Sequence, residues 1–598
     1  MKNNRKLRGE IGNTFHLSCC YAPSEKARNV LSQGRIIDQE ETPQDFLERV
    51  VATIFSVEDA FGTPPERIHL MAEEFAEYMA TGCITLGSPT LTNAGRYSYA
   101  LSSCAMLPIN LSVLNEATKE SMRSHYKQNM GGGFEFNCYD DPVAKLVWVN
   151  EFAAQESATG NYERYIGNMG LLHVSHPSVR AFIEAKRHRE MRHFNISIDV
   201  TEEFMRRVEN EDLIALADGT QIKASEILHL MAENAWQNGE PGLIFLERMN
   251  KDNPMANSSM YSYVTTAPCA EIGLAKGEAC HFGYINLYSF VQDSSQGARI
   301  NYDRLRDATQ LLTRALDNAI EYSMLRYPMA TTTYMAQMNR KMAIGVCGLA
   351  DLFLAHKLPY DSSQARMFAR DVLSFINYIS KCTSVTLAEE RGSCLAMNFP
   401  QVNKYVNGTL LEAKYAMNPT RTVSSHDWEK LANTIRRTGK LRNMLTTALA
   451  PTGRSSILLD ATSSIEPLFS IFTSDGSLQK QVLNFLSNEL AGDEHTLAQV
   501  CQQASLAGSF QHIESLPPSV RECLKTAKEI APLAHLQMVA TVAGMEGVID
   551  EAASKTVNLP MSATVDDVKD IFLAAYHLGL KNISVYRDKT MVGQPMHL

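Results

Sequence analysis

From about Ile84 onward, short apolar runs alternate with longer stretches in which apolar residues recur three and four positions apart. The short runs VWVNEF, LIFL, INLYSF and ISVY indicate strands. The longer stretches FIEAKRH, TEEFMRRVENE, RLRDATQLLTRALDNAIEY and SSQARMFARDVLSFINYISK indicate helices. Such alternation is typical of an α/β architecture with parallel strands. We find no internal repeat and no linker long enough to separate independent domains.

The first part of the chain has a different pattern. Residues 43–80 carry apolar side chains at helical spacing, interrupted at the turn-forming stretch 62–65 (GTPP). This pattern predicts helices joined by a turn. We therefore expect an N-terminal helical segment over residues 1–80 and one large α/β unit over residues 81–598.

Composition limits the classes of partner and compartment. The net charge of −10 argues against a broad nucleic-acid-binding surface, so we expect no nucleic-acid partner. No apolar run approaches the roughly 20 residues that span a bilayer, and the basic N-terminus is not followed by the apolar core of a signal peptide. The 12 cysteines are spread over the whole chain. We therefore expect reduced thiols in the cytoplasm and no membrane partner.

One short segment places a thiol beside a carboxylate. In TTAPCAEI, Cys269 and Glu271 are two residues apart, and in an extended loop such side chains point the same way. Cys280 follows eleven residues after Cys269, and Cys104 lies far upstream. Taken alone, a lone cysteine is most often a small buried apolar residue. A spacing of eleven without histidine does not indicate zinc, so we expect no metal site.

The sequence motifs around these residues are more informative about function than the spacing of the cysteines. The chain resembles the catalytic subunit of ribonucleotide reductases, in particular the adenosylcobalamin-dependent class, from about Ser88 to Asp588. The matching words, in order, are SPTLTNAG, SSCAMLP, the GGG of NMGGGFEFN, GNMGLLHVSHP, FNISIDVTEEFM, PCAEI, ACHFGYINL, IGVCGLADL, RNMLTTALAPTG, TSSIEPLF, SKTVNLP and ISVYRD. Many blocks in one order are far more specific than any single block.

The resemblance implies a fold and a set of catalytic roles. The fold is a ten-stranded α/β barrel of two five-stranded halves, with the Cys269 loop passing through its centre. Cys269 matches the cysteine whose thiyl radical removes hydrogen from C3′ of the ribose, and Glu271 matches the acid that takes the 3′-hydroxyl proton. Cys104 and Cys280 match the pair that donates two electrons and closes to a disulfide, which requires Cα atoms within about 7 Å. Gly131–Gly133 could form tight turns near the site, and ordinary turns without a role in the site would look the same.

The resemblance also implies where substrate binds. Phosphate recognition is expected at a stretch whose glycine, serine and threonine precede an apolar run, as at a helix N-terminus that suits an anion. An ordinary helix cap would look the same. A second loop and the residue two positions before Cys269 complete the expected site. The expected substrate-binding residues are Ser88, Thr90, Ala267, Pro451, Thr452, Gly453, Arg454, Ser455 and Ser456.

The radical source follows from the resemblance and from features that other classes have. Iron-dependent members use a pair of adjacent tyrosines near the C-terminus, and this chain has the single word ISVYRD there. Glycyl-radical members need a characteristic glycine context, which MVGQPMHL lacks. Adenosylcobalamin is therefore the expected cofactor. The chain has no D-x-H-x-x-G motif, so we expect no histidine ligand to the cofactor from a module that carries this motif.

Four departures from the family pattern concern the reaction. Ala267 replaces an asparagine that helps to hold the substrate hydroxyls and the catalytic carboxylate. Arg454 replaces a threonine, and it could bind phosphate in a forked geometry or point to solvent. The stretch 136–142 is shorter than the family's loop for allosteric nucleotides. The chain also lacks the C-terminal cysteine pair that receives electrons from thioredoxin, since no cysteine follows Cys523.

Three hypotheses follow. The first is reduction of ribonucleotides to 2′-deoxyribonucleotides, with a nucleotide substrate and a dithiol reductant that is thioredoxin-like or a small thiol. The second is a diverged radical enzyme that performs a rearrangement, elimination or epimerisation on a nucleotide or related sugar. The third is a catalytically silent nucleotide-binding homologue. The sequence leaves open whether the chain is a monomer or a homodimer.

Overall fold

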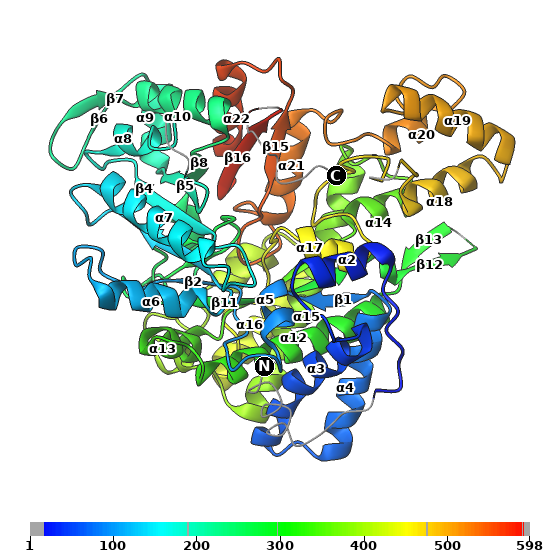
Figure 1. The fold of residues 1–598 in the computed structure, drawn as a ribbon, viewed down its shortest axis with the longest axis horizontal. Coiled ribbons are helices and arrows are strands. Elements are labelled where there is room, and N and C mark those ends of the chain that lie inside the picture. The colour runs from blue at the N-terminus through cyan, green and yellow to red at the C-terminus, as the bar shows by residue number, and fades with distance from the viewer. Residues whose placement is uncertain (1–16, 188–190, 296, 474–475, 589, 591–598) are drawn as a thin grey trace.

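The computed structural model describes residues 17–187, 191–295, 297–473, 476–588 and 590 (Figure 1). The expectations about the basic N-terminus and about MVGQPMHL fall outside these residues. No helix within the described ranges is both long enough and apolar enough to cross a membrane.

The N-terminal part is helical, as the spacing predicted. Thr42 caps the second helix in a reciprocal pair with Asp45, and Pro43 occupies its first position, where a missing N–H costs nothing. Gly62 then adopts a positive φ and ends the short 3₁₀ turn that follows. The elements are α2 (Glu25–Gln33), α3 (Pro43–Phe55), η1 (Ser56–Phe61) and α4 (Pro65–Ala80).

The first half of the barrel consists of five parallel strands. In order around the ring they are β2 (Cys104–Met106), β3 (Gly131–Glu135), β4 (Asn168–His173), β5 (Phe194–Asp199) and β8 (Gly242–Ile244). Helices α6 (Glu116–Tyr126), α7 (Pro142–Ala158), α8 (Val179–Ile183), α9 (Glu202–Glu209) and α10 (Ala224–Asn238) lie between them along the chain. Parallel strands joined through helices are the arrangement that the sequence predicted.

The second half runs antiparallel to the first and closes the ring. Its members are β11 (Ala279–Asn286), β14 (Met342–Cys347), the stretch 445–449, β15 (Thr556–Leu559) and β16 (Asn582–Arg587). Parallel bridges at Ile344–Thr447 and Leu449–Ala553 join β14 to the chain that enters β15. β11 pairs with β2 and β16 pairs with β8, both antiparallel. The expected barrel of two five-stranded halves is confirmed.

The remaining elements surround this barrel or extend from it. The strands are β1 (Ile84–Leu86), β6 (Leu213–Ala215), β7 (Gln221–Lys223), β9 (Thr265–Thr266), β10 (Gly273–Leu274), β12 (Val291–Ser294) and β13 (Gly297–Ile300). The helices are α5 (Ser88–Asn93), α11 (Leu246–Asp252), η2 (Leu287–Phe290), α12 (Tyr302–Met324), α13 (Ala330–Asn339), α14 (Leu349–Ala355), α15 (Ser363–Arg391), η3 (Leu395–Asn398), η4 (Glu412–Ala416), α16 (Ser425–Thr438), α17 (Gly453–Leu458), α18 (Lys480–Glu489), α19 (Glu494–Ala507), α20 (Pro518–Cys523), α21 (Pro532–Ala543) and α22 (Val565–His577).

One predicted strand is wrong. VWVNEF lies inside helix α7, which Asp141 caps by accepting a hydrogen bond from the Ala144 amide. Its buried residues include Leu146, Val149 and Ala153, which recur at helical spacing. The V-W-V alternation suggested a strand because a short apolar run is compatible with both the helical and the strand periodicity. INLYSF is a strand only as far as Asn286 and then becomes η2.

Alternation along β11 decides which residues face the barrel interior. Cys280, Phe282 and Tyr284 belong to the interior apolar cluster, together with small residues of β14 and of the stretch after it. Gly283 faces outward, where an added Cβ would lie 2.8 Å from a methyl carbon of Leu312 in α12. Successive side chains point to opposite faces of a strand, so the three interior residues form one row.

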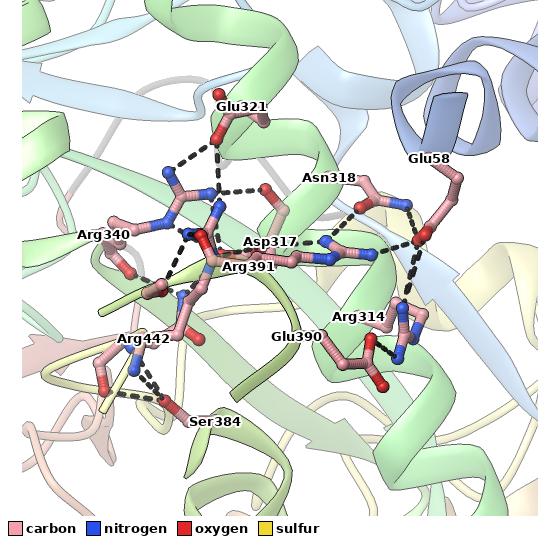
Figure 2. A network of polar contacts seen from close by, with 12 residues as sticks. Glu58, Arg314, Asp317, Asn318, Glu321, Arg340, Ser384, Glu390, Arg391 and Arg442 are labelled. Atoms are coloured by element: carbon pink, nitrogen blue, oxygen red, sulfur yellow. Dashed lines mark hydrogen bonds and ion pairs between the residues drawn. The ribbon is translucent and has the colours of Figure 1, made fainter. Parts of the chain in front are cut away.

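A buried ionic network attaches the N-terminal segment to the barrel (Figure 2). Asp317 in α12 accepts bonds from Arg340, Arg391 and Arg442 at 2.8–3.1 Å. Arg391 also contacts Glu58 of η1, which is fully buried. Burial alone would raise the pKa of Asp317, but the three arginines hold it well below its usual value. The carboxylate is therefore ionised in the folded chain.

Replacing Asp317 by asparagine removes the charge that three buried arginines share. We expect Asp317→Asn to lower the free energy of unfolding at pH 7 by about 3–5 kcal/mol, measured by denaturant titration. Because the folded-state pKa is depressed, this stabilisation is present above about pH 4 and is lost as the pH falls below it. Asp303→Asn, at an exposed site in the same helix, should cost about 1 kcal/mol or less. Equal effects of the two variants would contradict this account.

Candidate active site

Cys269 lies at the tip of a tight loop between two short strands. β9 and β10 pair antiparallel, and the Ala267 amide donates to the Ile272 carbonyl at 3.0 Å. The Ala270 amide donates back to the Ala267 carbonyl at 2.9 Å, and Ala270 has a φ of +63°. This turn places Cys269 at the end of the hairpin, which we call the finger loop (residues 265–274).

Both halves of the barrel hold the finger loop through its main chain. Asn195, on β5, donates to the Pro268 carbonyl at 2.8 Å. Asn582, on β16, donates to the Ala270 carbonyl at 2.6 Å. The Ala552 amide donates to the Glu271 carbonyl at 3.0 Å. The loop therefore lies between the halves, as the resemblance implied.

Glycines of β3 make room for the finger loop. An added Cβ on Gly133 would lie 2.7 Å from the Thr266 carbonyl oxygen, and one on Gly131 would lie 3.0 Å from side-chain atoms of Cys104 and Pro268. The expectation of tight turns at Gly131–Gly133 was wrong, because these residues are in a strand. At Gly133 the backbone of the finger loop leaves no room for a side chain, and at Gly131 the side chains of Cys104 and Pro268 take that space.

Cys104 and Cys280 lie directly opposite each other on β2 and β11. Residues in register on antiparallel strands have Cα atoms about 4.5–5.5 Å apart, within the range that a disulfide requires. Both are free, buried thiols. A hydrogen bond from Cys280 lowers the pKa of Cys104, and the charge of Arg164 adds to this effect against the cost of burial. Burial raises the pKa of Cys280 well above its usual value. Cys104 is thus the thiol that ionises first.

Cys269 differs from its neighbours in accessibility. Its side chain is exposed, whereas Ala267 and Glu271 are buried. Protein atoms still surround the loop on its other sides, and this burial, followed by the charge of Glu271, raises the pKa of Cys269 well above its usual value. The thiol therefore stays protonated. A neutral S–H group is what hydrogen-atom transfer requires.

Glu271 has the features of a general base. Burial raises its pKa to about 8, and the nearby Cys104 adds to the shift. Its Oε2 atom makes no hydrogen bond within the described part of the chain. A buried carboxylate oxygen without a partner is costly unless a ligand supplies one. The arrangement suits a substrate hydroxyl that hydrogen-bonds to this oxygen and gives up its proton.

The two residues of the upstream loop lie in α5. Ser88 is half-buried at its first position. Thr90 is fully buried, and its hydroxyl donates to the Leu101 carbonyl at 2.7 Å. The Thr90 hydroxyl is therefore engaged in holding the loop together. Ala267 is fully buried in the interior cluster beside the two thiols of β2 and β11.

The expected phosphate stretch begins α17. Pro451, Gly453 and Arg454 are exposed there, whereas Thr452, Ser455 and Ser456 are buried. The Thr452 hydroxyl accepts from the Ser464 amide at 2.8 Å, so it braces the loop that follows. Arg454 reaches the Gly34 carbonyl at the end of α2, at 3.3 Å. It therefore contacts the N-terminal segment instead of pointing freely to solvent.

Two residues near the site were missed by the sequence reasoning. Arg164 donates to the carbonyls of Ser103 and Asn129 at 3.2 and 3.1 Å, and its charge acts on Cys104, Cys269 and Glu271. Nothing in ERYIGN marks this arginine, because its contacts are distant in sequence. Tyr284 lies in the same interior row as Cys280, and the charge of Glu271 acts on it. Its position two and four residues after Phe282 and Cys280 on β11 was a usable signal.

Sequence comparisons agree with this geometry. The family model described as "Ribonucleotide reductase, barrel domain" matches residues 140–586, and the one described as "Ribonucleotide reductase, all-alpha domain" matches residues 26–98. The chain belongs to the ribonucleotide reductase family. The two matches leave residues 99–139 between them, so a boundary at residue 80 stays a prediction.

Across the described ranges, no group of three His, Cys, Asp or Glu side chains is placed to hold a metal ion.

Individual relatives support the same assignment. The chain is 31% identical over 584 residues to a vitamin B12-dependent ribonucleoside-diphosphate reductase of Mycobacterium tuberculosis, covering 93% of this chain and 77% of the relative. It is 32% identical over 546 residues to the protein of that name in Thermoplasma acidophilum, covering 87% and 65%. The fold is similar to that of the Actinobacillus ureae class Id ribonucleotide reductase alpha subunit, with a TM-score of 0.73, 19% identity and coverage of 95% and 98%.

A methyl group at Gly133 tests the close approach of the finger loop. We expect Gly133→Ala to lower the free energy of unfolding by about 1–3 kcal/mol, because the new Cβ would overlap the Thr266 carbonyl. Gly167→Ala is the matched control, since an added Cβ there meets no atom within 4 Å. Denaturant titration of both variants measures the difference. Loss of stability in the control but not in Gly133→Ala would contradict the packing described.

Proposed function

We propose that this chain reduces ribonucleotides to 2′-deoxyribonucleotides by a thiyl-radical mechanism, with adenosylcobalamin as the radical source. The observation that carries the proposal is the placement of Cys104 and Cys280 in register beside the loop that bears Cys269 and Glu271. Membership of the family and the known activity in the names of its relatives support it.

The accessible tip of the finger loop fits a radical that comes from a bulky cofactor. Asn195 and Cys269 are exposed there, and Pro268 and Ala270 are half-buried. These residues would face the cofactor, which supplies, when bound, the radical that converts the Cys269 thiol to a thiyl group. The chain itself keeps that thiol neutral and fixes its position through the bonds to the Pro268 and Ala270 carbonyls.

The remaining steps follow from the arrangement of the side chains. The Cys269 thiyl takes hydrogen from C3′, and Glu271 takes the 3′-hydroxyl proton while the 2′-hydroxyl leaves as water. Cys104 and Cys280 together give two electrons and two protons, and they close to a disulfide. Cys269 then returns hydrogen to C3′. The balance is one ribonucleotide and two thiols converted to one deoxynucleotide, one disulfide and one water.

Other parts of the chain would bind the nucleotide and receive external electrons. The start of α17, with Pro451, Gly453 and the residues that follow, would face the phosphates, and α5 would border the substrate. A thioredoxin-like protein or a small dithiol would reduce the disulfide after each turnover. Twelve free cysteines suit a reducing compartment, and we propose the cytoplasm. The proposal holds for a monomer or a homodimer.

One observation favours a second candidate. Ala267 has no polar side chain and is fully buried, so the amide that the family uses beside the substrate hydroxyls is missing. A diverged radical enzyme of the same fold, which rearranges, eliminates from or epimerises a nucleotide or related sugar, would still need Cys269. It would not need two electrons from Cys104 and Cys280.

The direct test incubates the full chain with adenosylcobalamin, dithiothreitol and each ribonucleotide, and it measures 2′-deoxynucleotide by chromatography. We expect multiple turnovers, with no product from Cys269→Ala. Cys104→Ser and Cys280→Ser should each abolish sustained turnover. Product formation that is independent of both thiols favours the second candidate. The absence of any deoxynucleotide with every substrate refutes the reduction.

The pKa of Glu271 predicts a pH profile. Because the base must be ionised and its pKa is raised to about 8, we expect kcat/KM to rise with pH and to level off above about 8. Glu271→Gln should lower kcat/KM by about 10²–10⁴-fold and remove this limb of the profile. A wild-type profile that is flat from pH 6 to 9 would show that Glu271 is not the base.

A further inference from the structure

A buried ion pair holds the main chain of the finger loop just after Glu271, the proposed base. The Gly273 amide donates to the Glu551 carboxylate at 3.1 Å, and the Gly273 carbonyl accepts from the Lys341 ammonium at 2.5 Å. Lys341 and Glu551 pair with each other at 2.8 Å. The Ala552 amide donates to the Glu271 carbonyl at 3.0 Å. Two other segments, one before β14 and one before β15, therefore fix the backbone that carries the base.

The ring of Tyr263 covers the same backbone position. An added Cβ on Gly273 would lie 2.1 Å from a ring carbon, so a larger residue does not fit there. The Tyr263 hydroxyl donates to Glu551 at 2.6 Å, and the Lys341 ammonium lies 4.1 Å from the ring centroid. Burial, and then the charges of Glu551 and Glu278, raises the pKa of Tyr263 well above its usual value. The phenol therefore stays a hydrogen-bond donor to Glu551.

This buried group holds one cation against two carboxylates. Glu278 is the second acid, 3.4 Å from the Lys341 ammonium. Burial would lower the pKa of Lys341, but the charges of Glu278 and Glu551 raise it above its usual value, so the lysine is charged. The nearby Lys581 donates to the main-chain carbonyl of Glu551 and pairs with Asp252 instead. One negative charge is thus left over beside the finger loop.

The excess charge acts on the proposed base. Burial is the main cause of the raised pKa of Glu271; Cys104 and Glu551 raise it further, and Arg164 opposes them. The ionisable groups around Glu271 include Cys104 on β2, Cys269 on the finger loop, Cys280 and Tyr284 on β11, Arg164 before β4 and Glu551 before β15. Among these, Glu551 also bonds to the main chain of the finger loop.

We propose that Glu551 and Lys341 are positioning residues that act through Glu271: their bonds to Gly273 fix where the Glu271 carboxylate lies. A displacement of about 1 Å at a reacting group can cost about 100-fold in rate, so a firm hold on this backbone matters. The excess charge of Glu551 also makes Glu271 hold a proton more strongly, which suits a group that must take one. The inference rests on the proposed function and extends it to a part of the chain outside the finger loop.

The first test removes the charge and keeps the hydrogen bond. Glu551→Gln retains an oxygen that can accept from the Gly273 amide, and it leaves Lys341 balanced by Glu278. Because a like charge is then gone from beside Glu271, we expect the midpoint of the rise in kcat/KM with pH to fall by about 0.5–1 pH unit. At pH 7 a larger fraction of the base is then ionised, so kcat/KM should increase about two- to fivefold.

The second test keeps the charge and shortens its reach. Glu551→Asp removes one carbon, so the carboxylate can no longer hold Gly273 and Lys341 as before. We expect kcat to fall about 10–100-fold, with KM unchanged, because the base is misplaced while the substrate still binds. The pH midpoint should stay at the wild-type value. A kcat equal to that of the wild type would overturn the proposal, and this variant decides the question if Glu551→Gln fails to fold.

Glu58→Gln is the matched control. Glu58 is also a fully buried glutamate of an ionic network, and it pairs with Arg314 and Arg391 (Figure 2). The control should lower the free energy of unfolding and leave the pH midpoint unchanged. A Glu551→Gln midpoint equal to that of the wild type would refute the proposal, and so would an equal shift in the control.

Infrared spectroscopy follows the protonation of Glu271 without any turnover, in the chain free of cofactor and substrate. The carboxyl C=O band that disappears in Glu271→Gln reports the protonated acid, and its pH midpoint should be lower in Glu551→Gln, with the double variant as baseline. If this midpoint moves but the wild type never forms deoxynucleotide, the proposed reduction fails while the coupling of Glu551 to Glu271 stands. If reduction occurs and the infrared midpoint does not move, the coupling is refuted.

Discussion

The chemistry of this chain depends on a backbone segment held inside a barrel. The finger loop can enter because β3 offers Gly131 and Gly133 where any side chain would collide with it. It is then fixed by hydrogen bonds to its own carbonyls from Asn195 and Asn582, one from each half of the barrel. Main-chain anchoring leaves the side chains of Cys269 and Glu271 free to act on a ligand.

The ionisable groups near the finger loop differ in pKa, because burial, neighbouring charges and hydrogen bonds act on each of them differently. Burial raises the pKa of Cys269 well above its usual value and the pKa of Glu271 to about 8, whereas a hydrogen bond from Cys280 lowers the pKa of Cys104. The charge of Arg164 opposes the rise in the pKa of Cys269 and Glu271 and adds to the fall in the pKa of Cys104. Under the proposed function, these three states suit a hydrogen-atom donor, a proton acceptor and an electron donor, respectively.

The sequence predicted the part of this arrangement that depends on short sequence motifs. PCAEI, SSCAMLP and ACHFGYINL identified the loop and the thiol pair, and helical spacing identified α12 and α15. It misassigned VWVNEF, because a short apolar run satisfies two periodicities. It also missed Arg164 beside the active site, since its contacts with Ser103 and Asn129 join positions distant in sequence and no local pattern records them.

The central claim is that Cys104, Cys269, Glu271 and Cys280 act as one reducing unit. A single-turnover experiment tests it most directly: the fully reduced chain, loaded with adenosylcobalamin and substrate but given no external reductant, is quenched and its free thiols are counted. The account predicts one deoxynucleotide per chain and a disulfide that peptide mapping assigns to Cys104 and Cys280. Deoxynucleotide formed without loss of these two thiols would contradict it.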